Sequence, residues 1–135
     1  MNEPEQIRAI LKEGKTVAVV GCSPNPMRPS NAIAEFLIDR GYDVIPVNPG
    51  HREILGRKCY RSLEDVPADV PIDIVDVFRR SDHVAELVEP AIARGVKFFW
   101  MQEGVIDPES ARRLEAAGLG VAMDRCILKE YRHID

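Results

Sequence analysis

Short β-branched runs alternate along this chain with longer amphipathic stretches, and this alternation constrains the fold more than any other feature. The runs predict strands at 17–20, 44–47, 57–60, 72–77, 97–101 and 121–123, with 57–60 as a short edge strand. Strands that alternate with helices form βαβ units, which build a mostly parallel sheet with helices on both faces. Right-handed crossovers then predict a Rossmann-like α/β domain with a strand order near 3-2-1-4-5-6.

The stretches between the strands carry helix signals. Ser81 is predicted to cap a helix that ends at Gly95 and is kinked at Pro90, because a proline inside a helix costs ~3 kcal/mol or more. Asp124 is predicted to cap a C-terminal helix. Pro46 lies in the second predicted strand, where it removes a donor from the ladder. The helices are predicted at 1–14 (helix or arm), 30–41, 62–65, 81–95, 107–118 and 124–131.

The size and composition of the chain indicate one domain over residues 1–135. No apolar stretch is long enough to cross a bilayer, and the polar N-terminus lacks the features of a secretory signal, so we expect a cytoplasmic protein. Cys22, Cys59 and Cys126 form no C-x-x-C pair, which predicts reduced thiols and no zinc site. The formal net charge of -4 argues against nucleic-acid binding, because neutralising phosphates needs a basic face.

The residues that follow each strand are the candidate site, because ligands of open α/β sheets bind beyond the carboxyl ends of the strands. The first strand leads through a loop into a helix, whose free N–H groups favour a phosphate. This loop is a candidate pyrophosphate cradle that contains Gly21, Cys22, Ser23, Arg28, Pro29 and Ser30. Gly21 is its one glycine, so the loop matches neither G-x-G-x-x-G nor a P-loop. An ordinary rigid loop with a capping Ser30 is the alternative interpretation.

Asn48, Pro49 and His51 follow the second strand, where an NAD-binding protein usually places an acidic residue that holds the ribose hydroxyls. The missing carboxylate favours a ligand with an extra phosphate on its ribose, as in NADP or coenzyme A. A plain Asn-Pro-Gly turn is the alternative interpretation.

Aromatic and polar residues follow the next two strands. Phe78 and Arg79 offer an aromatic face and a positive charge to a nucleotide, although Phe78 fits the core equally well. Gln102 and Glu103 follow the fifth strand, where they either bond a ligand or cap the next turn. The spacing leaves both interpretations open.

Candidate catalytic groups are few. Cys22 precedes a helix, where a thiol can become reactive, but a cysteine that simply fits the space is the commoner case. The histidines are isolated, and the chain contains neither H-E-x-x-H nor G-x-S-x-G. We therefore expect no catalytic activity and no metal site.

At these loops the sequence resembles the small bacterial CoA-binding proteins, which are similar to the N-terminal domain of the succinyl-CoA synthetase alpha subunit. The resemblance extends from about Thr16 to Ile134. It rests on the segments VGCSPNPMRPS at 20–30, VNPG at 47–50, DVFR at 76–79 and WMQEG at 100–104. Coenzyme A is therefore the cofactor that the resemblance implies.

The resemblance also implies roles for individual residues. The phosphates of the cofactor would contact Cys22, Ser23, Arg28 and Ser30, and the end of the second strand would contribute Asn48, Pro49 and His51. Further contacts map to Val77 and Phe78, and, near the pantetheine, to Met101, Gln102 and Glu103. The first loop lacks the second glycine of the synthetase, which weakens the case for backbone contacts there. The sequence also stops before the domain that carries the phosphorylated histidine, so ligase activity is not implied.

Three hypotheses follow. The first is a non-catalytic module that binds coenzyme A or an acyl-CoA as a carrier, sensor or partner subunit. The second is an enzyme, either an NADP-binding reductase fragment or a thiol-dependent catalyst that uses Cys22. The third is an interaction protein whose nucleotide site has decayed. We expect a small nucleotide cofactor as partner, neither nucleic acid nor a membrane, and leave a protein partner or a homo-oligomer open.

Overall fold

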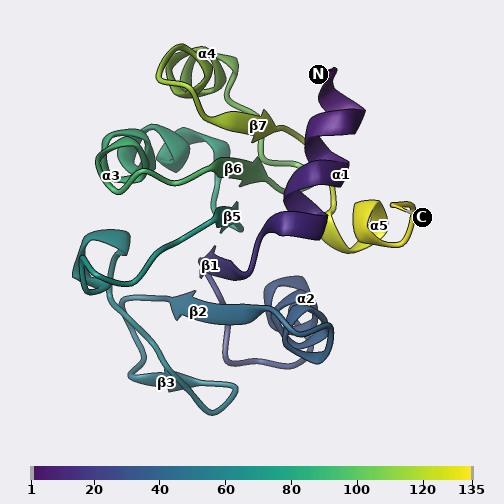
Figure 1. Cartoon of the computed structure of the whole chain (residues 1–135). Coiled ribbons are helices and arrows are strands. Elements are labelled where there is room, and N and C mark those ends of the chain that lie inside the picture. The colour runs from purple at the N-terminus through teal and green to yellow at the C-terminus, as the bar shows by residue number, and fades with distance from the viewer. Residues whose placement is uncertain (1, 135) are drawn as a thin grey trace.

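A five-stranded parallel sheet forms the centre of the computed structural model, which describes residues 2–134 (Figure 1). The strands stand in the order β2-β1-β5-β6-β7. They are β1 (Thr16–Val20), β2 (Asp43–Val47), β5 (Ile74–Val77), β6 (Phe98–Met101) and β7 (Gly120–Ala122). Most of their residues are buried, because helices cover both faces of the sheet. The predicted Rossmann-like α/β fold is confirmed.

The helices form one layer on each face of the sheet (Figure 1). One layer contains α1 (Glu3–Glu13), α2 (Pro29–Asp39) and α5 (Ile127–Tyr131). The other contains the 3-10 helices η1 (Leu63–Asp65) and η2 (Ser81–Leu87), with α3 (Val88–Ala93) and α4 (Pro108–Ala116). Each layer encloses its own apolar core, with Trp100 fully buried in the first and Phe99 in the second. The N-terminal segment, predicted as a helix or an arm, is a helix.

A small hairpin takes the place of the predicted edge strand at 57–60. Its strands β3 (Glu53–Ile54) and β4 (Arg57–Lys58) pair with each other, and Tyr60 alone forms a parallel bridge to Val47. The third strand is therefore missing from the predicted order, and β2 forms the edge of the sheet.

The direction in which the backbone of Pro46 points explains how β2 tolerates a proline. Its carbonyl accepts the N–H of Tyr60 at 3.1 Å on the outer side of the strand. In a parallel strand the nitrogen and the carbonyl of one residue point to the same side, so the missing N–H of Pro46 faces away from β1. The central ladder therefore loses no hydrogen bond, while a longer outer strand would lose one.

The prediction of a single kinked helix at 81–95 is wrong, since η2 and α3 are separate elements. Pro90 lies in the first turn of α3, where a backbone N–H would have no acceptor within the helix, so the lack of one costs no hydrogen bond. Ser81 does not cap η2. Its hydroxyl donates to the Gly104 carbonyl at 3.3 Å and accepts the N–H of Ile106 at 2.8 Å.

The prediction that Asp124 caps the C-terminal helix is also wrong. Its backbone adopts a φ of 60°, and its Oδ1 accepts the N–H of Gly104 at 2.8 Å, while Cys126 stands at the N-cap position of α5. The predicted helix ends at Gly41, Gly95 and Gly118 are confirmed, since each glycine directly follows a helix C-cap.

Among residues 2–134, no helix combines the length and the apolar character that crossing a membrane requires.

Candidate functional site

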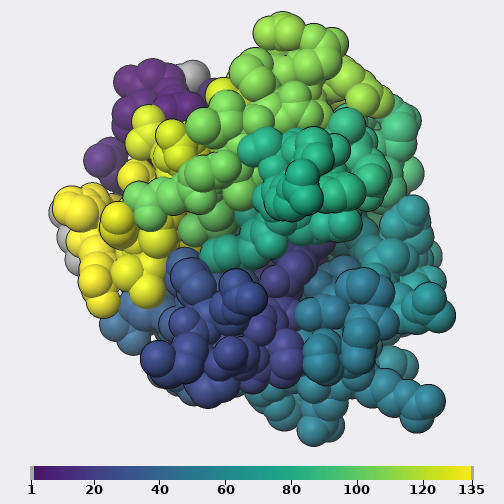
Figure 2. Space-filling view, turned by 180° about the vertical axis from the view of Figure 1, so that it is seen from behind, coloured from purple at the N-terminus to yellow at the C-terminus, as the bar shows by residue number. Residues whose placement is uncertain are grey.

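Two adjoining pockets lie beyond the carboxyl ends of the central strands. They have cavity volumes of about 730 and 580 Å³, and both are lined by Gly21, Phe78, Arg79 and Arg80. The first pocket extends toward α2 and α5, and the second extends toward the end of β2 and toward η1 and η2. In Figure 2, the dark-blue segment that follows β1 faces the teal and green segments that follow β5 and β6 across the middle of the molecule.

Gly21 allows the two pockets to meet. It directly follows β1 with a φ of +86°, and a Cβ built on it would lie 2.4 Å from the carbonyl oxygen of Phe78. Any side chain at this position would collide with the backbone that leads to Arg79. The glycine thus brings the end of β5 against the end of β1.

The loop between β1 and α2 is held by its own side chains. Ser30 Oγ accepts the N–H of Ser23 at 2.9 Å, and Ser23 Oγ accepts the N–H of Asn25 at 3.0 Å. Arg28 occupies the N-cap position, and Ser30, in the first turn of α2, does not cap the helix. Ser23, Arg28, Pro29 and Ser30 all line the first pocket. The loop is preorganised, but several N–H groups that could cradle a phosphate are already engaged within it.

The end of β2 supplies part of the second pocket. Asn48 and Pro49 line it, whereas His51 is exposed and lines neither pocket. Asn48 Nδ2 donates to the Cys22 carbonyl at 2.8 Å, and Asn48 Oδ1 accepts the N–H of Gly50 at 2.9 Å. The Asn48 side chain therefore ties the end of β2 to the end of β1.

Arginines supply the positive charge of the site. Arg79 and Arg80 line both pockets, where Arg79 lies 3.7 Å from Glu86 and Arg80 lies 3.1 Å from Asp82. Arg28 is exposed and forms no ion pair within the described part of the chain. Exposed ion pairs contribute little to stability, so these guanidinium groups can rearrange at low cost toward an anionic ligand.

Three of the candidate residues have fully or almost fully buried side chains that line neither pocket: Cys22, Val77 and Met101. Burial raises the pKa of the Cys22 thiol to about 12, with smaller contributions from Cys59 and Asp76. A thiol with this pKa is protonated at neutral pH and is a poor nucleophile. The geometry therefore disfavours a thiol-dependent catalyst at Cys22.

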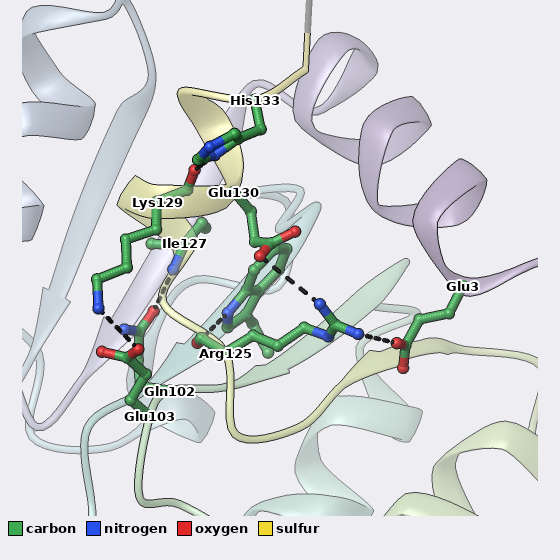
Figure 3. A network of polar contacts seen from close by, with 9 residues as sticks. Glu3, Gln102, Glu103, Arg125, Ile127, Lys129, Glu130 and His133 are labelled. Atoms are coloured by element: carbon green, nitrogen blue, oxygen red, sulfur yellow. Dashed lines mark hydrogen bonds and ion pairs between the residues drawn. The ribbon is translucent and has the colours of Figure 1, made fainter.

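The loop after β6 forms one wall of the first pocket, and contacts with α5 hold it in place (Figure 3). Gln102 is 4% exposed, and its Oε1 accepts the N–H of Ile127 at 3.2 Å. Glu103 Oε2 lies 2.9 Å from Lys129 Nζ. The hydrogen bonds to Gly104 described above hold the other side of this loop.

The segment between β7 and α5 brings Cys126 to the first pocket. Trp100 Nε1 donates to the Arg125 carbonyl at 2.9 Å. The Arg125 guanidinium lies 2.5 Å from Glu3 and 3.6 Å from Glu130, which ties the segment to α1 and α5 (Figure 3). Cys126 was not predicted as a site residue, although it follows the carboxyl end of a strand.

Other lining residues that the sequence did not identify come from η2 and from the segment before η1. Arg61, His83 and Glu86 line the second pocket, and His83 Nδ1 lies 3.2 Å from Glu86 Oε2. Basic residues near predicted loops were the available signal, but their spacing does not show which of them turn toward the sheet.

Comparison with known proteins identifies the family of the chain. A family model described as a CoA binding domain matches residues 15–132, which include both pockets. The chain belongs to the CoA-binding domain family. This membership confirms the resemblance inferred from the loops after the strands.

Individual members of the family are similar over very different shares of their length. The chain is 41% identical over 122 residues to uncharacterized protein YneT of Bacillus subtilis, covering 90% of this chain and 89% of that protein. It is 40% identical to a hypothetical protein from Pyrococcus horikoshii OT3, whose structure matches with a TM-score of 0.91 over 97% of this chain and 91% of that one. An ADP-forming acetate–CoA ligase of Methanocaldococcus jannaschii is 34% identical over 83 residues. That match covers 62% of this chain and 12% of the ligase.

Proposed function

We propose that this member of the CoA-binding family binds coenzyme A, or an acyl-CoA, across the two pockets and has no catalytic activity of its own. The observation that carries the proposal is that two pockets at the strand ends adjoin at four shared residues. Coenzyme A is an elongated ligand with a phosphorylated nucleotide at one end and a thiol at the other. A double pocket with arginines at its junction suits both the length and the charge of this ligand.

The orientation of the ligand follows from the chemistry of each pocket. The adenosine end lies in the second pocket beside Asn48 and Pro49, because the residues directly after β2 include no carboxylate that would repel the ribose phosphate. Glu64 and Glu86 also line this pocket, where three arginines offset their charge: Arg61, Arg79 and Arg80. The pyrophosphate lies at the junction, within reach of Arg28 and Arg79. The pantetheine arm extends into the first pocket toward Gln102, in agreement with the resemblance to the synthetase domain.

Thermal unfolding with coenzyme A, dephospho-coenzyme A, NADP and NAD tests the proposal. A ligand at 100 times its dissociation constant adds ~2.7 kcal/mol to the free energy of unfolding. Coenzyme A is expected to stabilise the protein most, and dephospho-coenzyme A less. Stronger stabilisation by NADP would favour a reductase fragment, and no stabilisation by any of the four would favour a decayed nucleotide site.

Substitution of Arg28 tests the charge contribution. Arg28→Ala is expected to raise the Kd for coenzyme A about tenfold, because charge-assisted hydrogen bonds contribute ~1.5–3 kcal/mol. Arg112→Ala removes a similar charge from α4, outside both pockets, and is expected to leave the Kd unchanged. Equal effects of the two variants would contradict a phosphate contact at Arg28.

The proposed lack of catalysis has its own test. Cys22 is protonated, and the His133 ring lies 2.6 Å from the Lys129 carbonyl, at the far end of α5 from the first pocket. His83 lines the second pocket, away from the proposed position of the thioester in the first. Acetyl-CoA in large excess over the protein is therefore expected to release no more than one equivalent of coenzyme A per chain above the release in buffer. Repeated turnover of acetyl-CoA would contradict a pure binding role.

A further inference from the structure

A thiol lies in the wall of the first pocket. All three cysteines are buried, but Cys126, which is 8% exposed, lines this pocket together with Gln102 and Ile33. Cys22 and Cys59 line neither pocket. If coenzyme A binds in the orientation proposed above, its own thiol lies at the end of the arm that enters this pocket. Two thiols then share one cavity.

Gln102 indicates independently that this part of the pocket receives a ligand. Its side chain is almost completely buried, and its Oε1 is occupied by the N–H of Ile127, the residue that follows Cys126. The Gln102 Nε2 has no hydrogen-bond partner within residues 2–134 and belongs to a residue that lines the pocket. A carbonyl of a pantetheine arm would satisfy this donor, and the hydrogen bond to Ile127 fixes the donor relative to Cys126.

Lys129 adds a positive charge to the same cluster. It stands one turn along α5 from Cys126 and lies 2.9 Å from Glu103, which also lines the pocket. The hydrogen bond and the negative charge of Glu103 raise the pKa of Lys129, so the Lys129 side chain stays positively charged at this wall of the pocket. The thiolate is the form of a cysteine that attacks disulfides.

We propose that Cys126 undergoes thiol–disulfide exchange with CoA disulfides, so that the first pocket holds coenzyme A as a mixed disulfide. This inference rests on the proposed function. The Cys126 thiolate attacks the CoA sulfur, a bond forms between Sγ and that sulfur, and the original S–S bond breaks. The departing thiolate takes up the proton that Cys126 released. Cys126 is oxidised and the departing half of the disulfide is reduced, so the CoA disulfide itself is the oxidant.

Intact-mass measurement of the whole protein tests the exchange. With CoA disulfide, we expect one CoA adduct per chain, located on Cys126 by peptide mapping and removed by a reducing agent. The adduct is expected to form about tenfold faster than the adduct from oxidised glutathione, because the nucleotide half holds the disulfide next to the thiol. Cys126→Ser is expected to give no adduct, whereas Cys59→Ser, which also replaces a buried thiol, keeps it.

Thermal unfolding with reduced coenzyme A separates the two proposals. If coenzyme A stabilises the wild type and Cys126→Ser, but CoA disulfide gives no adduct, an adduct on another cysteine, or no advantage over glutathione, the exchange is overturned and the binding function stands. If coenzyme A stabilises neither protein, the binding function itself fails. Cys126→Ala repeats the comparison without placing a hydroxyl in the core.

Discussion

Ser81 and Ile106 are joined by a hydrogen bond of 2.8 Å from the Ile106 N–H to the Ser81 hydroxyl, across 25 residues of sequence. The same hydroxyl donates to the Gly104 carbonyl. One side chain at the start of η2 thus fixes the loop that forms a wall of the first pocket. Because η2 also supplies residues of the second pocket, Ser81 couples the two pockets through the backbone.

Removal of this hydroxyl is expected to loosen the loop. Ser81→Ala should lower the free energy of unfolding by ~1 kcal/mol and raise the Kd for coenzyme A about threefold, because two backbone groups lose a partner. Urea unfolding and titration calorimetry measure the two effects. Ser110→Ala, which removes a buried hydroxyl from α4 that bonds Asp107, should lower stability without changing the Kd. An unchanged Kd in Ser81→Ala would show that the loop keeps its position without the hydroxyl.

Substitution of Gly21 is expected to be much more harmful than substitution of another glycine with positive φ. Gly21→Ala places a Cβ against the Phe78 carbonyl and should lower the free energy of unfolding by ~3 kcal/mol. Gly56→Ala, at a φ of +72° with no atom within 4 Å of the added Cβ, should lose ~1 kcal/mol. Urea unfolding of both variants provides the comparison. Equal losses would mean that the backbone at Gly21 moves aside at little cost.

Because of Asp76, we expect the free energy of unfolding to decrease as the pH rises. It is fully buried in β5, and neither carboxyl oxygen has a hydrogen-bond partner among the described residues. Burial raises the pKa of Asp76 well above its ordinary value of 3.8. Between these two pKa values the folded protein binds a proton that the unfolded chain has released, so its free energy of unfolding falls as pH rises.

Asp76→Asn tests this expectation, because asparagine has no carboxyl group that could bind or release a proton. The free energy of unfolding of the variant, relative to the wild type, is expected to increase above pH 3.8 by up to ~1.4 kcal/mol per pH unit. Urea unfolding at a series of pH values measures the difference. A difference independent of pH would mean that the carboxyl finds a partner in solution.

Because of Asp73, three residues earlier, we expect a contribution to the free energy of unfolding with the opposite pH dependence. Its Oδ2 accepts the N–H groups of Lys15 at 2.7 Å and Thr16 at 3.1 Å, and Lys97 lies 3.4 Å from Oδ1. Burial acts to raise the pKa of Asp73, but these hydrogen bonds and the Lys97 charge together lower it. The contribution of the Asp73 carboxylate to the free energy of unfolding is complete above 3.8, the ordinary pKa of an aspartate. It is lost as the pH falls through the lower pKa that Asp73 has in the folded protein.

Asp73→Asn is therefore expected to be less stable than the wild type at neutral pH, with a difference that narrows on acidification. Acid unfolding followed by circular dichroism measures it. A difference that grows toward low pH would contradict a lowered pKa.

The sheet was predictable from sequence because its strands are buried on both faces. A strand such as β1 then contains a run of consecutive apolar residues, at 17–20, and glycines such as Gly41 mark the helix ends. The failed cap predictions share one cause. Ser81 and Asp124 have the short polar side chains of helix caps, but both bond the loop after β6, which is distant in sequence.

The candidate site was predictable where its residues directly follow strands. Gly21, Phe78 and Gln102 were identified in this way, because the carboxyl ends of parallel strands meet at one edge. His83 and Cys126 were not, because their positions depend on how η2 and α5 fold back against that edge. Such packing between distant segments leaves no local pattern in the sequence.

Trp100 gives this protein an optical reporter of its own. It is the single tryptophan of the chain, its side chain is fully buried, and its indole N–H bonds the carbonyl of Arg125, directly before Cys126. It also stands in register with Asp76 on the neighbouring strand. Its fluorescence therefore samples the segment that carries Cys126, so the loading of the first pocket can be followed in real time without attaching a dye.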